Sequence, residues 1–210
     1  AGLVGDAGPR AAQAAGPWYV NTVGGNDTNN CLAPAPGGAG VGPCLTVGAA
    51  IGKATSGDTV IIAAGTYITQ NITLTKSINL AGVGQTLTVL SANNPGRHFF
   101  NPPAHTLTMT KLSVRNANIS GGGGVAGAVL NQGTFIASDV EFRDNRTDSI
   151  GGGLYNSGSA YLIRTAFLKN GGGTFGGGLG NGGTMFIVDS EFLANDATNG
   201  GGLTNRGGAS

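Results

Sequence analysis

The chain has 210 residues, of which 41 are glycine, 40% are hydrophobic and only 10% are charged. The glycines fall in clusters rather than at every third position, which excludes collagen, and the hydrophobic content argues against a disordered chain. Glycine destabilises an interior helix position by about 1 kcal/mol relative to alanine, so a helical bundle is disfavoured. The composition therefore favours a compact, turn-rich β protein of one domain or one array of repeats.

The charge pattern excludes two classes of partner. Eleven basic and ten acidic side chains give a net charge of +1, without a basic block. We therefore expect no nucleic-acid partner. No apolar run approaches the ~18 residues of a membrane span, so we expect no span either. No pattern in the sequence indicates a cofactor, and we expect none.

Residues 1–17 are rich in alanine and glycine and have no place in the repeat described below. They contain no signal peptide, so we expect the chain to be the processed form of an exported protein. One interpretation of this segment is a plain linker. The other is an inter-subunit arm that adds to the open coil of a neighbour by β-augmentation, with Leu3 and Val4 as apolar anchors.

Residues 18–58 are expected to form an N-terminal cap, in which Cys31 and Cys44 flank a Pro/Gly-rich loop. Two buried thiols are one alternative, and a zinc site would need further Cys or His nearby. We favour a disulfide, which should stabilise the fold by ~3 kcal/mol in the chain-entropy model. A disulfide indicates export, so we expect an extracellular or cell-surface protein.

The same cap should contain a short helix over residues 47–54, because Thr46 is a favourable N-cap residue. A turn over 56–58 then leads into a first strand at 59–62, where the expected parallel β-helix, residues 59–210, begins.

From about residue 107 the sequence repeats. The string GGGLxN occurs three times and AGAVLN is a degenerate copy, so that four asparagines lie 25, 25 and 24 residues apart. A second string places three phenylalanines 25 residues apart. This period fits one coil of a parallel β-helix, in which strands of neighbouring coils lie ~4.8 Å apart. The expected stacks are Asn131, Asn156, Asn181 and Asn205 and, inside the coil, Phe142, Phe167 and Phe192.

A column of charged residues tests this register independently. Three residues before Val114 and each phenylalanine, the charge alternates in sign between successive coils. Stacking in register would place each charge between opposite charges, as a solvated surface ladder that contributes little to stability. The column comprises Lys111, Asp139, Arg164 and Asp189.

Two stretches carry a family resemblance. WYVNTVGGNDTNNC, followed by PCLTVGAAIGKATSGDTVIIAAGTYI, resembles the start of pectin-lyase-like parallel β-helix domains of secreted bacterial proteins. GGGLYNSGSAYLIRTAFLKN is similar to the repeats of polymorphic-outer-membrane-protein-like surface proteins. The resemblance implies a right-handed coil with a short helix over its first turn. It implies no single function, because this scaffold hosts lyases, hydrolases, adhesins and stalks.

Enzymes on this scaffold cluster carboxylates on an outer face, and five acids are candidates here: Asp139, Glu141, Asp144, Asp189 and Glu191. Stacking would place the first and fourth two coils, ~10 Å, apart. Because ladders explain these columns without catalysis, we expect no catalytic site. His98 and His105 lack acidic neighbours in the sequence, so we expect no metal site.

The outward positions of the repeat strand are apolar over three coils, which is more than scattered exposed side chains. We expect an interface comprising Ile136, Tyr161, Ile163, Phe186 and Val188. We also interpret the lack of a capping helix after Asn205 as an uncovered coil edge, which invites strand pairing.

These features favour an extracellular, non-enzymatic β-helix subunit that assembles head to tail into a filament or surface layer. Two alternatives stay open. One is a secreted polysaccharide lyase, hydrolase or carbohydrate-binding domain, with a polysaccharide or cell-surface ligand. The other is an adhesin or stalk fragment of a longer protein.

Overall fold

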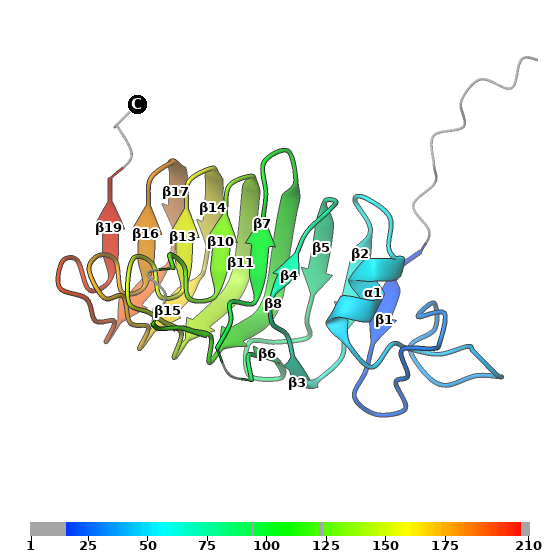
Figure 1. Cartoon of the computed structure of the whole chain (residues 1–210). Helices are drawn as coiled ribbons and strands as arrows, with labels where there is room; N and C mark the ends of the chain where they lie inside the picture. The colour runs from blue at the N-terminus through cyan, green and yellow to red at the C-terminus, as the bar shows by residue number, and fades with distance from the viewer. Residues whose placement is uncertain (1–15, 94, 122–123, 207–210) are drawn as a thin grey trace, which may run out of the picture.

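The computed structural model describes residues 16–93, 95–121 and 124–206 of the chain. The expected anchors Leu3 and Val4 lie outside the described residues. The described chain winds into a right-handed parallel β-helix with one short helix at its N-terminal end (Figure 1), which confirms the fold predicted from the repeat.

One long parallel sheet runs along the whole rod and receives one strand from every coil. Its main path contains β1 (Trp18–Val20), β2 (Thr59–Ile62), β5 (Ile78–Ala81), β8 (Thr106–Arg115), β11 (Thr134–Arg143), β14 (Ser159–Ile163) and β17 (Thr184–Val188). Four further strands join this sheet around a corner: β3 (Gly65–Ile68), β6 (Thr88–Ser91), β15 (Ala166–Leu168) and β18 (Glu191–Leu193).

A second parallel sheet closes another side of the coil. It contains β4 (Ile72–Thr73), β7 (Phe99–Asn101), β10 (Val129–Asn131), β13 (Leu154–Asn156), β16 (Leu179–Asn181) and β19 (Leu203–Asn205). A third, two-stranded sheet pairs β9 (Asn118–Ile119) with β12 (Arg146–Thr147).

Strand pairing confirms the 25-residue period. Asn131 pairs with Asn156, Asn156 with Asn181, and Asn181 with Asn205. Phe142 pairs with Val114 on one side and with Phe167 on the other, as the repeat predicts. Because side chains alternate along a strand, one set of apolar residues fills the interior of the coil, and burying each contributes roughly 1.5–3 kcal/mol.

The four residues of the charge column form a corner of the coil. Lys111, Asp139, Arg164 and Asp189 have φ angles of 52°, 56°, 46° and 48°. Non-glycine residues in this left-handed region carry strain of about 1–3 kcal/mol each, so the neighbouring packing must hold them there. The sequence predicts the column but gives no sign of its backbone conformation.

The helix α1 (Val47–Lys53) covers the N-terminal end of the coil beside β1 and β2 (Figure 1). Thr46 is its N-cap, as predicted, and its side chain accepts a hydrogen bond from Ala49 N–H. Val47, Ala50 and Ile51 are the buried residues of the helix, so its apolar face closes the lumen at this end.

Candidate functional site

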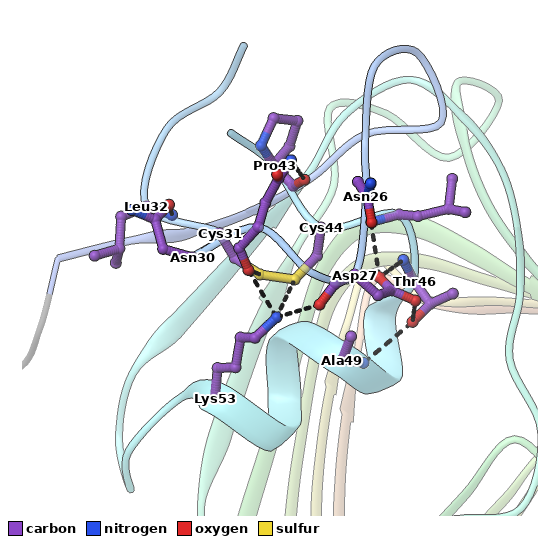
Figure 2. The surroundings of a disulfide bond; sticks show 12 residues. Asn26, Asp27, Asn30, Cys31, Leu32, Pro43, Cys44, Thr46, Ala49 and Lys53 are labelled. Carbon is purple, nitrogen blue, oxygen red and sulfur yellow. Dashed lines mark hydrogen bonds between the residues drawn. A yellow bond between two sulfur atoms is a disulfide. The ribbon is translucent and has the colours of Figure 1, made fainter. Parts of the chain in front are cut away.

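The disulfide between Cys31 and Cys44 is present, as predicted, and its loop lies against β1 (Figure 2). We call residues 31–44 the disulfide loop. Tyr19 N–H donates to the Cys31 carbonyl (2.7 Å), and the Tyr19 carbonyl accepts from Cys44 N–H (2.8 Å). Asn21 N–H donates to the Cys44 carbonyl (3.0 Å). The disulfide loop therefore occupies the edge of β1 that faces away from β2.

Polar contacts fix the segment before the disulfide loop to both ends of the helix. The Asp27 carboxylate accepts hydrogen bonds from the backbone N–H groups of Leu45 and Thr46 and from the Thr46 hydroxyl. The Lys53 ammonium donates to the carbonyls of Asp27 (2.5 Å) and Asn29 (2.7 Å) and lies 3.7 Å from Cys44 Sγ (Figure 2).

The buried carboxylate of Asp58 also stabilises the N-terminal end of the rod. Asp58 accepts hydrogen bonds from Trp18 Nε1 (2.8 Å) and from the backbone and hydroxyl of Thr55. Burial alone would raise the pKa of Asp58, but these hydrogen bonds outweigh it and lower the pKa. The ionised side chain thus joins β1 to the turn before β2.

At the C-terminal end of the described rod, by contrast, one edge of the last strand of the long sheet has no partner among the described residues. Thr184 N–H donates to the Gly158 carbonyl (2.9 Å) and the Val188 carbonyl accepts from Arg164 N–H (3.0 Å), so these residues of β17 face β14. Alternate residues of a parallel strand point to opposite edges. The backbone groups of Met185 and Ile187 therefore point away from β14, and they have no partner among the described residues.

Asparagine ladders run along the rod and include more residues than the four predicted from the sequence. Side-chain Nδ2 donates to the Oδ1 of the next coil at 2.6 Å (Asn131 to Asn156), 2.7 Å (Asn156 to Asn181) and 2.8 Å (Asn181 to Asn205). Asn101 extends this ladder by one coil, with a 2.7 Å bond to Asn131.

A second ladder joins Asn145 to Asn170 and Asn170 to Asn195, each at 3.0 Å. The same side chains donate to the backbone carbonyls of Val114, Phe142 and Phe167. Sequence reasoning missed this ladder, although its residues end the repeated strings VEFRDN, TAFLKN and SEFLAN.

The three repeat phenylalanines stack inside the coil. The ring centroids of Phe142 and Phe167 lie 5.0 Å apart, and those of Phe167 and Phe192 lie 4.9 Å apart. The first two side chains are fully buried, whereas Phe192 in the last described coil is only partly buried. The stack therefore ends in an aromatic ring without a layer above it.

The charge column contains one close ion pair. Arg164 Nε lies 2.7 Å from Asp139 Oδ1. The hydrogen bond from Arg164 is the main reason that the pKa of Asp139 falls to about 2. A general acid requires a raised pKa, so this carboxylate is tuned in the opposite direction.

The remaining catalytic candidates are only partly brought together. Glu141 is buried between Arg115 (2.8 Å) and Arg143 (3.1 Å), which compensate its charge. Asp189 and Glu191 line a groove of about 370 Å³ together with Asp139, Arg164, Gln85, Thr165, Ala166 and Ser190. Asp144 does not line this groove.

His98 is fully buried, and both of its ring nitrogens have partners: the Thr69 hydroxyl and the Arg115 carbonyl. Burial lowers its pKa to about 4. His98 therefore acts as a neutral interior bridge between coils. Over the described ranges, no cluster of three or more His, Cys, Asp or Glu has a geometry suited to a metal ion.

The expected apolar interface forms a stripe on the outer face, with Ile136, Tyr161 and Phe186 in one column and Ile163 and Val188 in the next. The Tyr161 and Phe186 rings are parallel, with centroids 5.7 Å apart. Their faces are thus directed along the rod, toward neighbouring coils, and their edges face solvent. The stripe also borders a shallow hollow of about 230 Å³.

The comparisons with family models, curated proteins and solved structures find no match. None of the helical segments in the described chain has the length and apolar character needed to cross a membrane.

Proposed function

We propose that the protein is an extracellular, non-enzymatic structural protein, a β-helix subunit that assembles head to tail into a filament or surface layer. The observation that carries this proposal is the outer edge of β17, which pairs with no strand among the described residues. The strand reads TMFIV and contains neither charge nor proline, the two features that usually protect edge strands from pairing.

The inward side chains of the last described coil show what a further coil would cover. Met185, Ile187 and Phe192 point inward but are only partly buried, so another coil stacked upon them would complete their packing. A second copy of the chain is the partner that we propose.

Three further features support the proposal. Asp139 is held ionised by Arg164, and Glu141 is enclosed by two arginines. The intrachain disulfide is compatible with an oxidising, extracellular location. The rod itself is continuous, because ladders connect its successive coils.

The second candidate is a carbohydrate-binding or carbohydrate-active domain. The groove that contains Asp139, Arg164, Asp189 and Glu191 favours it, because these groups and the neighbouring hydroxyls would hydrogen-bond a sugar. A panel of polysaccharides, tested by affinity electrophoresis and by release of reducing ends, distinguishes this candidate. Activity lost in Asp139→Ala would support the enzyme and contradict the structural proposal.

The assembly itself is tested by electron microscopy and analytical sedimentation over a range of concentrations, with the disulfide closed and with it reduced. We expect end-to-end filaments under at least one of these conditions. Ile187→Lys places an inward charge on the open edge and should abolish them, whereas Leu87→Lys, at an exposed site in the middle of the rod, should not. Short monodisperse rods under every condition would contradict the proposal.

A further inference from the structure

The edge of β1 is the place where a second copy would have to dock if the rods continue head to tail. Tyr19 belongs to an outward column that continues through Ile61, Ala81, Thr110, Ser138, Ile163 and Val188. A coil added before β1 in this register would therefore place Val188 of the second copy beside Tyr19. The next residue, Asp189, would lie beside Val20.

The disulfide loop already occupies these positions. Cys44 forms a parallel bridge with Val20, where Asp189 of a second copy would lie. Its N–H donates to the Tyr19 carbonyl, and its carbonyl accepts from Asn21 N–H. The first bond follows the pattern between true coils, in which Arg164, opposite Asp189, donates to the carbonyl of Val188.

Cys31 supplies the remaining partner of this edge. Its carbonyl accepts from Tyr19 N–H at 2.7 Å, which is the bond that the Ile187 carbonyl of a second copy would make in the same register. The two cysteines thus stand in for two residues of a preceding strand, and the disulfide joins them covalently. All three backbone groups that β1 presents at this edge are occupied by the disulfide loop.

We propose that the disulfide loop is a removable plug, which competes with β17 of a second copy for the edge of β1. This inference rests on the proposed head-to-tail assembly and adds a mechanism that regulates it. With the disulfide closed, the plug stays in place and head-to-tail addition is blocked, so assembly in an oxidising location requires a local dithiol reductant. Opening the disulfide releases the edge of β1, and rods then join through parallel strand pairing.

The surroundings of the disulfide favour one way of opening it. Both cysteines are fully buried, so this reaction requires local opening of the loop. A thiolate of a dithiol reductant then attacks Cys31 Sγ, the S–S bond breaks, and Cys44 leaves as a thiolate. The second thiol of the reductant then displaces Cys31, so the protein gains two thiols and the reductant becomes a disulfide. The Lys53 ammonium, 3.7 Å from Cys44 Sγ, stabilises the departing thiolate.

The test compares the full chain with its disulfide closed, the same protein in dithiothreitol, and the double variant Cys31→Ser, Cys44→Ser. Filaments are followed by sedimentation and electron microscopy. Loss of this cross-link should lower the concentration needed for filaments about 100-fold. The closed protein should stay as short rods over the same range. Ile187→Lys should stay short when reduced, and Leu87→Lys should behave as the parent.

A second measurement separates release of the plug from loss of the fold. At a dilution where only single rods are present, reduction should accelerate amide hydrogen exchange at Tyr19 and Asn21 and leave the amides of β8 and β11 unchanged. Continued protection of Tyr19 and Asn21, or loss of protection along the whole rod, would overturn the plug.

The failures of the two proposals are distinct. Filaments that form equally well with the disulfide closed would overturn the plug and leave head-to-tail assembly standing. Absence of filaments in the closed protein, the reduced protein and the double variant would overturn the assembly itself, and the plug with it.

Discussion

The two ends of the described rod are built differently although they share one coil geometry. At the N-terminal end, α1 covers the lumen and the disulfide loop pairs with the edge of β1. At the C-terminal end, one edge of β17 pairs with nothing among the described residues, and the inward side chains are partly exposed. Terminal coils of solenoids are usually covered by capping elements. In the proposed assembly the rod would therefore extend from its C-terminal coil.

The largest expected effect compares the same residue type in the middle and at the open end. Phe167→Ala removes a fully buried ring between two others and should lower the free energy of unfolding by about 3–5 kcal/mol. Phe192→Ala removes a ring with one open face and should cost clearly less. Denaturant unfolding of both variants checks this, and equal losses would contradict an open C-terminal coil.

Acid should weaken the middle of the rod through His98. The pKa of His98 is about 4 in the folded chain and about 6.5 when unfolded. The unfolded state then binds more protons, so stability is lost as pH falls from about 6.5 to about 4, by roughly 3 kcal/mol. Denaturant unfolding at several pH values should show this loss in the parent and much less of it in His98→Gln. An unchanged profile in that variant would contradict the assignment.

The asparagine ladder offers a smaller, matched comparison. Asn156 is fully buried and bonded on both sides, so Asn156→Ala leaves buried polar groups unpaired and should cost about 1–3 kcal/mol. Asn205 is exposed and ends the described ladder, so Asn205→Ala should cost less. Thermal unfolding checks the order of the two variants. The reverse order would show that the ladder does not stabilise the rod.

The smallest effect is expected at the charge column, because its side chains are exposed to solvent. Arg164→Ala should change the unfolding midpoint less than any variant above, and ~1 M salt should remove the difference. The variant should also lose the acid sensitivity that Asp139 contributes as pH falls from 3.8 to about 2. A large, salt-independent loss would indicate that the corner itself depends on this ion pair.

Periodic features and interactions between neighbouring residues could be predicted from the sequence, whereas pairing between distant, non-repeating segments could not. The 25-residue spacing predicts the stacks of Asn156 and Phe167, because every coil repeats one geometry. The N-cap preference of threonine predicts Thr46 as a helix cap, since that interaction involves neighbouring residues. The pairing of Cys44 with Val20 is different, because it joins non-repeating segments through backbone groups and leaves no side-chain pattern.

The difference between the two ends is tested most directly by amide hydrogen exchange of the oxidised protein at several concentrations. The amides of Tyr19 and Asn21 should exchange slowly at every dilution, because the disulfide loop occupies them. Those of Met185 and Ile187 should exchange rapidly in dilute protein. Rapid exchange at Tyr19 and Asn21, or concentration-independent protection at Met185 and Ile187, would contradict a rod that is plugged at one end and open at the other.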